Sequence, residues 1–534
     1  MPGAAWPCAP HFGALCPSNG VDVLSATDHS LARRSGLRVF VYRNVPKSFH
    51  SGLFTKGLPA EVKRGKMCDF ASGPCTPQDP PPSSPGYSME LNEWLHSMKH
   101  CADVPLLAKL IALGSIEGVH TDNPAEAHLF VVPFLGGFAE RVSPQMSYAL
   151  DRQRRQGDGI VDRLLGHLPH YSSETAARHL FLLTNSCGGC LRAPCFRCAS
   201  WQVVNQSRFG AGIEFAATLG PSWPLDAIPK GQSPPSGRKW LRQVIIPPNI
   251  MEAELHPPKY VPLCSVPGET GPSVAPNRPC RANSAAKELL AFYQGAHSFN
   301  GARDLILKEL REAVFSSSGG SGGNATCDCG RTPACCVNAT SRVAFFHTRS
   351  HWHPVTPLGF AATIQWMQRS KFCVCPPGDV PYNKRYFTAI LAGCVPVLFS
   401  FRSQVAHERN WWKPKKGPGQ RDIDPFHGQI NHTALGVEFR IDNEKEDFRG
   451  FVDKLRDVPD EVVEAKQREI ERVRHLLLYD MSGSREDAFT CMLRQTIRML
   501  AALPSRRDGA QNEPAPLKRP DRRQHGRLSV HGKI

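Results

Sequence analysis

The segment from Ser370 to Ser400 constrains the fold of this chain more than any other. It reads SKFCVCPPGDVPYNKRYFTAILAGCVPVLFS. An apolar run, Phe372–Cys375, is followed by a loop rich in proline and then by a helix-compatible stretch from Lys384 to Leu391. A second apolar run covers residues 394–401. This succession of strand, loop, helix and strand within about thirty residues predicts a βαβ unit.

The start of the predicted helix carries two cations, Lys384 and Arg385. In a βαβ unit this helix start lies at the carboxyl end of the first strand, where free N–H groups and the helix dipole favour an anionic ligand. Cations at that end are unfavourable in an empty helix. They suit a bound diphosphate, which arginine can bind with two parallel hydrogen bonds. The alternative is a plain βαβ unit with solvated Lys384 and Arg385.

The same segment resembles the signature of the exostosin family of glycosyltransferases. The matching runs are SKFCVCPPGD, R-x-F-x-A-I and AGCVPVLFS. Further runs agree with the family pattern in the same order: Leu37–Tyr42, Tyr87–Glu90, Thr121–Phe134, Val244–Pro248, Val473–Leu476 and Asp487–Phe489. The resemblance therefore covers about residues 37–500.

The alternation of strand-like apolar runs with helical spacing predicts parallel sheets covered on both faces. The resemblance implies the GT-B architecture, an α/β fold in which two Rossmann-like domains face each other across a cleft. The predicted parts are a disordered leader, an N-terminal Rossmann-like acceptor domain, a Pro/Gly-rich linker, a C-terminal nucleotide-sugar-binding domain and a basic disordered tail. Their bounds are 1–36, 37–250, 251–283, 284–503 and 504–534.

The formal net charge of +16 suits a nucleic acid, an acidic polysaccharide or an anionic membrane. Part of this charge lies in the tail after Pro504, where no aromatic residue is present to stack on bases. Nucleic-acid binding is therefore disfavoured. The partners that the resemblance implies are a nucleotide sugar and a glycan or glycoprotein acceptor, with homo- or hetero-oligomers of related transferases as a further option.

Nineteen cysteines and four N-x-S/T sequons indicate the secretory pathway, where disulfides are stable. The sequons predict glycosylation at Asn205, Asn324, Asn338 and Asn431. Members of the family are usually type II membrane proteins of the Golgi, so the resemblance implies the Golgi or secretory-pathway lumen. No signal or membrane-spanning run is visible in this sequence, which departs from that pattern.

Transfer from a nucleotide sugar builds negative charge on the departing diphosphate, and fixed cations and helix N–H groups stabilise it. Lys384, Arg385 and the amides after Gly378 are the predicted donor-binding groups, because Gly378 permits a close backbone approach. Asp379 either contacts the ligand, orients Arg385 or caps the helix. With these cations in place no divalent metal is expected, and no cofactor beyond the donor substrate, taken as a UDP-sugar. Asp422-Ile423-Asp424 is interpreted as a surface loop rather than as a metal motif.

Two more residues are predicted to bind the donor. Lys371 is a further cation of the same domain, and its alternative is a surface residue at the entry of a strand. Glu444 follows a predicted strand at 437–441 and matches a family acidic position that could accept hydrogen bonds from the ribose or the sugar. A solvated loop glutamate is the alternative for this residue.

The resemblance implies an inverting transfer, which needs a general base to take the proton of the acceptor hydroxyl. Glu90 and His179 are the candidates because they match family acidic and histidine positions in the first domain. A structural role is the alternative for each of them. One departure affects the donor site: Thr388 stands where the family usually has Asp or Glu. A catalytically inactive glycan-binding or partner subunit is therefore the alternative function.

The cysteines leave two interpretations open. Cys187, Cys190, Cys195 and Cys198 have the paired spacing of a zinc site, and in a lumenal protein the same spacing suits disulfides. A zinc-containing interaction protein is thus a third functional reading. Cys373, Cys375 and Cys394 lie in apolar strands and are interpreted as buried thiols or as one bridge.

Overall fold

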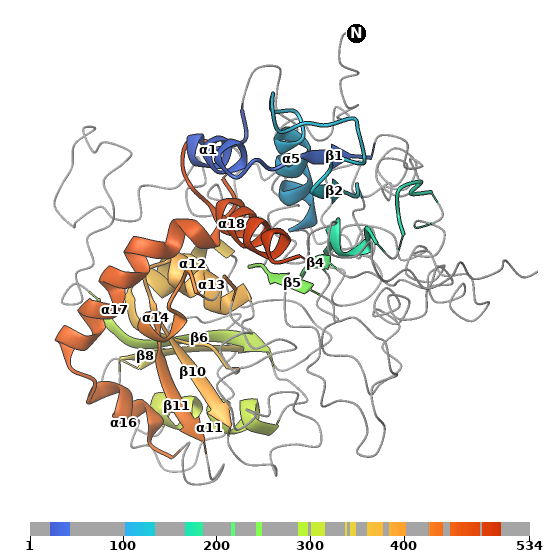
Figure 1. Cartoon of the computed structure of the whole chain (residues 1–534). Helices are drawn as coiled ribbons and strands as arrows, with labels where there is room; N and C mark the ends of the chain where they lie inside the picture. The colour runs from blue at the N-terminus through green and yellow to red at the C-terminus, as the bar shows by residue number, and fades with distance from the viewer. Residues whose placement is uncertain are drawn as a thin grey trace, which may run out of the picture.

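The structure is a computed structural model of the 534-residue chain. It describes two sets of helices and strands, each built on a sheet of mainly parallel strands (Figure 1). The described residues are 22–42, 102–133, 165, 167–172, 174–184, 215–218, 242–247, 287–296, 301–315, 337–338, 342–348, 360–376, 384–401, 425–426, 428–441, 449–480 and 483–503.

The first sheet contains five parallel strands in chain order. They are β1 (Val39–Val41), β2 (Leu129–Val131), β3 (His179–Leu183), β4 (Phe215–Thr218) and β5 (Arg242–Ile245). A short 3₁₀ helix, η3 (Ala176–Arg178), leads into β3. Two helices, α1 (Ala26–Arg34) and α5 (Asp103–Leu113), pack on this part of the molecule. The strands are short apolar runs because parallel strands are buried on both faces.

The second sheet has six strands in the order β11-β10-β9-β6-β8-β7. All neighbouring pairs are parallel except β7 and β8 at one edge, which are antiparallel. The bounds are β6 (Leu289–Ala296), β7 (Val337–Asn338), β8 (Val343–Thr348), β9 (Ser370–Val374), β10 (Val395–Phe401) and β11 (Val437–Ile441). The strand predicted over 437–441 and the apolar runs beginning at 372 and 394 are thereby confirmed.

Helices cover both faces of the second sheet (Figure 1). On one face α11 (Gly301–Phe315) packs with α16 (Phe451–Arg456). On the other lie α12 (Phe360–Gln368), α13 (Lys384–Leu391) and α17 (Asp460–Val473), with α14 (His432–Leu435) against α17. The helix predicted over 384–391 has these bounds. The parallel, helix-covered sheets that the sequence predicts are confirmed at this level.

The last helix, α18 (Ala488–Ala501), returns to the first sheet (Figure 1). It follows the 3₁₀ helix η11 (Arg474–Leu477) and contacts α1 and β5. Its N-cap residue, Asp487, forms an ion pair with Lys109 of α5 at 3.1 Å, and both side chains are 0% exposed. The hydroxyl of Tyr479 donates to the carbonyl oxygen of Pro247 at 3.0 Å. These contacts join the C-terminal helices to the first sheet.

One sequence prediction is wrong for part of the leader. Residues 1–36 are expected from the sequence to be disordered, yet residues 26–34 form α1, and this segment packs into the core through Ala32 and, just before the helix, Val23 and Leu24. The helix begins with a capping box in which Ser25 and Asp28 satisfy each other's backbone N–H groups. Packing against α18 and α5 stabilises this short segment, which its own sequence pattern does not reveal. Among the described helices, none is long and apolar enough to cross a membrane.

Candidate functional site at the carboxyl end of the second sheet

The order of strands creates a switch point between β6 and β9. The chain leaves β6 through α11 toward β8 on one side, and it leaves β9 through α13 toward β10 on the other. The connections from two neighbouring parallel strands thus diverge, and open α/β sheets typically have a crevice outside the carboxyl ends of strands with this topology. Ligands of open α/β sheets bind in this position. The predicted phosphate-binding helix, α13, begins at this edge.

Arg385, the second residue of α13, extends to the end of β6. Its guanidinium carbon lies 4.8 Å from the ring centroid of Tyr293, a β6 residue. A Cβ atom built on Gly295 would overlap Nη2 of Arg385, so the guanidinium occupies space that only a glycine leaves open. Among the described residues no hydrogen-bond partner faces the buried Nη1 atom of Arg385. A buried cationic donor without a partner is costly, and an anionic ligand would remove that cost.

Two residues of this site, Tyr293 and Gly295, are not among the sequence predictions. Tyr293 is 0% exposed, its ring stacks with Phe345 at a centroid distance of 5.8 Å, and its hydroxyl has no partner among the described residues. The only signal in the sequence is that an apolar strand, LLAFYQGA, ends in a small residue before a helix. That signal does not specify which side chain of another element the glycine accommodates.

The remaining donor-site predictions have mixed outcomes. Lys384 is the first residue of α13 and is partly buried. The hydroxyl of Thr388 donates to the carbonyl oxygen of Lys384 at 2.9 Å, so this buried side chain is satisfied within its own helix. Gly378, Asp379 and Glu444 lie outside the described residues.

Lys371, also predicted to bind the donor, lies apart from Arg385. It is the second residue of β9 and therefore lies toward the amino end of the strand, away from the crevice. Its ammonium group pairs with Asp460 in the first turn of α17, and its side chain is 16% exposed. The geometry supports the alternative that the sequence left open, a residue at the entry of a strand.

His179 lies in the interior of the first sheet. It is 0% exposed and stacks on Phe130 at a centroid distance of 4.3 Å. Its Nδ1–H donates to the Thr175 carbonyl oxygen at 2.8 Å, so its Nε2 accepts from the Tyr42 hydroxyl at 2.7 Å. Burial lowers the pKa of His179 to about 4, which keeps the ring neutral. Both nitrogens are thus occupied, which favours the structural alternative over the general base. The other candidate base, Glu90, lies outside the described residues.

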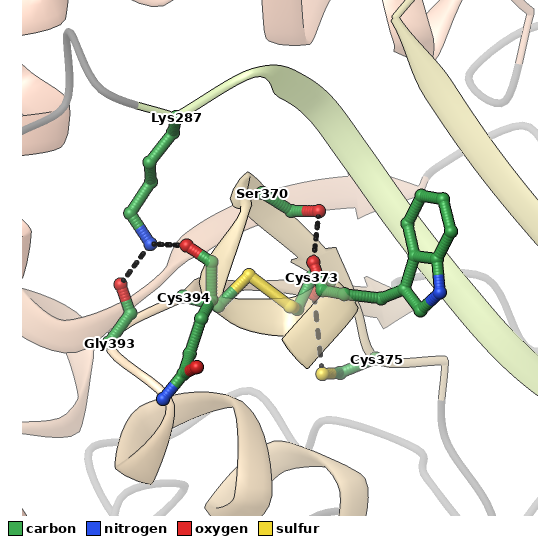
Figure 2. The surroundings of a disulfide bond; sticks show 8 residues. Lys287, Ser370, Cys373, Cys375, Gly393 and Cys394 are labelled. Atoms are coloured by element: carbon green, nitrogen blue, oxygen red, sulfur yellow. Dashed lines mark hydrogen bonds between the residues drawn. A yellow bond between two sulfur atoms is a disulfide. The ribbon is translucent and has the colours of Figure 1, made fainter. Parts of the chain in front are cut away.

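A disulfide links the two strand segments of the βαβ unit (Figure 2). It joins Cys373 of β9 to Cys394 at the start of β10, while Cys375 is a buried thiol. Of the three cysteines, two therefore form the one bridge that the sequence allowed. Lys287 lies beside this bridge, and its ammonium group donates to the carbonyl oxygens of Gly393 at 2.9 Å and Gln368 at 3.0 Å. Burial lowers the pKa of Lys287 to about 8.

The pKa of the Cys375 thiol indicates that Arg385 lies near the end of β9. Burial raises the pKa of Cys375 to about 12, and the positive charge of Arg385 acts in the opposite direction. The guanidinium is therefore within electrostatic reach of β9 as well as in contact with β6. A thiol with so high a pKa is inert as a nucleophile.

A hollow of about 400 Å³ lies at the amino ends of the strands of the first sheet. It is lined by Arg38, Ala125, Glu126, His128 and Arg178. Arg38 already pairs with Glu126 at 3.2 Å and donates to the carbonyl oxygen of Gly118. The amino ends of the strands form this edge, and among the described helices none begins there to favour an anion.

The predicted glycosylation and zinc residues are only partly described. Asn431 is exposed and precedes α14, with its side-chain oxygen accepting from the hydroxyl of Thr433 at 2.7 Å. Asn338 lies in the edge strand β7. The other members of both sets lie outside the described residues: Asn205, Asn324, Cys187, Cys190, Cys195 and Cys198. Glycosylation and the zinc alternative stay predictions.

Comparisons with known proteins support the family resemblance. Residues 262–417 match the Exostosin GT47 domain. The chain is 29% identical over 131 residues to a probable xyloglucan galactosyltransferase, GT13, of Arabidopsis thaliana, which covers 24% of this chain and 25% of the relative. It is 33% identical over 110 residues to a second such protein, GT19, of the same plant, covering 20% and 21% of the two chains.

These alignments span about a quarter or a fifth of the length of the curated relatives. The matched domain includes β6 to β10, and with them Tyr293, Gly295 and Arg385. The resemblance to the exostosin family that the sequence motifs indicate is confirmed over this region.

Proposed function

We propose that the chain is a glycosyltransferase of the GT-B type, because residues 262–417 match the Exostosin GT47 domain. It transfers a sugar from a nucleotide-sugar donor to a glycan or glycoprotein acceptor, with inversion at the anomeric carbon. The acceptor hydroxyl attacks that carbon, the bond to the diphosphate breaks, and a base takes the hydroxyl proton. The two helix-covered sheets support the GT-B assignment, with the acceptor on the first and the donor on the second.

The observation that carries the proposal is the partly buried Arg385 at the switch point, with Nη1 lacking a partner among the described residues. The leaving diphosphate gains negative charge in the transition state, and a donor already fixed there stabilises it without reorganisation. Arginine also matches the geometry of a phosphate better than lysine does. In this proposal the cations Arg385 and Lys384 stabilise the leaving group, and no divalent ion is needed.

The donor is proposed to be a UDP-sugar, and UDP-galactose is the first candidate because the similar plant proteins are named as galactosyltransferases. The site of action is proposed to be the Golgi lumen. A cysteine bridge such as Cys373–Cys394 is stable in an oxidising compartment of this kind.

A second candidate function rests on Thr388. Its buried hydroxyl is bonded to its own helix, so this position supplies no carboxylate to the donor site. If a carboxylate is indispensable there, the chain binds a nucleotide sugar or a glycan without transferring the sugar, and serves as a partner of an active transferase.

One experiment separates the two functions. The full chain is incubated with UDP- and GDP-sugars and a panel of glycan acceptors, with and without a chelator, and release of the nucleoside diphosphate is measured. Turnover with one donor supports the transferase. Binding of a donor without turnover supports the partner subunit, and the absence of both would contradict both.

A further inference from the structure

We propose that Tyr293 and Gly295 are positioning residues that fix the guanidinium of Arg385 in the donor site. The inference rests on the proposed function for the role of Arg385. It adds how that arginine is held, and by which element of the fold. Neither residue belongs to the motifs that indicate the family.

The first step is that Arg385 lacks the anchors that usually hold a buried arginine. Among the described residues, no carboxylate pairs with its guanidinium, and Nη1 has no hydrogen-bond partner. A free arginine side chain populates many rotamers, so a single orientation needs some other contact. The contacts present are the face of the Tyr293 ring at 4.8 Å and the backbone of Gly295.

The second step is that the ring of Tyr293, and not its hydroxyl, makes the contact. The hydroxyl has no partner among the described residues, so it does not bind Arg385 or anchor the ring. The ring is held by burial and by stacking on Phe345 at 5.8 Å. A cation over an aromatic face is attracted by the ring quadrupole, while its N–H groups stay available around the edge of the plane. The guanidinium is thereby oriented and its donors are left for a ligand.

The third step is the space at Gly295. A Cβ atom at this position would overlap Nη2 of Arg385 and lie 2.6 Å from the Tyr293 hydroxyl oxygen. Gly295 is in the strand near its carboxyl end and is partly exposed, so the missing side chain opens the site where the crevice begins. An alanine there must displace the guanidinium, the ring or both.

The test uses UDP and inorganic pyrophosphate as probes and compares four single variants of the full chain, together with Gly295→Ala in an Arg385→Ala background. Tyr293→Leu removes the ring and should weaken binding of both about tenfold. Tyr293→Phe keeps the ring and should bind like the wild type, without loss of stability because the deleted hydroxyl is unpaired. Gly295→Ala should weaken binding more than Tyr293→Leu, and it should add little in an Arg385→Ala background because the two changes act on one group.

The fourth variant, Phe292→Leu, is the matched control. Phe292 precedes Tyr293 in β6, points to the other face of the sheet and packs on Phe346 at 6.0 Å. The same loss of a buried ring should lower the melting temperature and leave the affinity for UDP unchanged. If Phe292→Leu weakens UDP binding as much as Tyr293→Leu does, the effect is general destabilisation and the inference is overturned.

A ligand-independent readout separates this inference from the proposed function. Phenylglyoxal modifies accessible guanidinium groups, and mass spectrometry follows the peptide that contains Arg385. We expect slow modification in the wild type and in Tyr293→Phe, and severalfold faster modification in Gly295→Ala and Tyr293→Leu. Equal rates in all four proteins would refute the positioning role even if UDP binds. A wild type that binds neither probe would instead refute the proposed donor site, while the labelling rates still test the positioning.

Discussion

Two polar residues with buried nitrogen atoms, His179 of the first sheet and Arg385 beside the second, differ in how far the protein satisfies them. In the first sheet His179 donates to Thr175 and accepts from Tyr42, so the imidazole is satisfied by the protein itself. Beside the second sheet, the buried Nη1 atom of Arg385 and the buried hydroxyl of Tyr293 have no hydrogen-bond partner among the described residues. Satisfied groups of this kind hold a fold together, whereas unsatisfied ones cost stability unless a ligand completes them. This difference is one reason to propose the donor site at Arg385.

The largest effect is expected where the two regions are joined. Lys109→Met removes the ammonium group from the buried pair with Asp487 and leaves that carboxyl group without its cation. Breaking one partner of a buried ion pair costs about 3–5 kcal/mol in the free energy of unfolding. Denaturant unfolding should show this loss. Tyr479, which lies just before α18, should become exposed in the same transition. Lys308→Met, which removes an exposed cation paired with Glu312 on α11, is the control and should leave the unfolding midpoint unchanged.

The next largest effect tests the unsatisfied arginine. Arg385→Ala should reduce turnover about 100- to 1,000-fold, the range for removing one fixed donor to a developing negative charge. It should leave the melting temperature the same or higher, because the deleted group contributes an unpaired buried donor. Initial rates at saturating donor and a thermal unfolding scan measure the two quantities. Unchanged turnover would show that the second sheet's unpaired groups are not where the leaving diphosphate binds.

The third prediction tests the satisfied histidine of the first sheet. Burial lowers the pKa of His179 to about 4 in the folded chain, from the ordinary histidine value of 6.5. Between these values the unfolded chain binds the proton that the folded chain refuses, so stability is present above pH 6.5 and is lost as pH falls toward 4. From pH 7 to pH 5 the wild type should lose about 2 kcal/mol through this group alone.

The variant His179→Gln measures that contribution by difference. Its free energy of unfolding should fall less between pH 7 and pH 5 than that of the wild type, because glutamine does not titrate. Tyr42→Phe is the matched control, since it removes the hydrogen bond to Nε2 and keeps the histidine. If the free energy of unfolding changes with pH in the same way for the wild type and His179→Gln, the imidazole is charged or accessible. His179 would then again be a candidate for the general base.

The sequence predicted those parts of the fold whose signals are local. From Phe372 to Leu391 an apolar run is followed by prolines and then by a helix-compatible stretch. Both the strand and the helix form where this pattern predicts them. The position of Arg385 in the first turn of α13 was predictable for the same reason, since a cation at a helix start after a strand is visible in the sequence. α1 was missed because its stability comes from α5 and α18, which are distant in the chain.

The residues that hold Arg385 were missed for a different reason. Tyr293 and Gly295 lie about ninety residues before it, and only the pairing of β6 with β9 brings them together. A buried tyrosine in an apolar strand looks like an ordinary core residue when the strand order is unknown. Lys371 is the opposite case, because its closeness to the motif in sequence suggested donor binding, while its position at the amino end of β9 favours the alternative role at the entry of a strand.

The smallest expected effect concerns the two ends of β9. Lys371→Ala removes a cation at the amino end of β9, where it pairs with Asp460, whereas Arg385 lies beyond the carboxyl end. A pair with so exposed a partner contributes at most about 1 kcal/mol to stability. We therefore expect a small decrease in melting temperature and unchanged affinity for UDP. If Lys371→Ala weakens UDP binding as Arg385→Ala does, the ligand is held by the charge of the whole domain and not by the crevice at one edge.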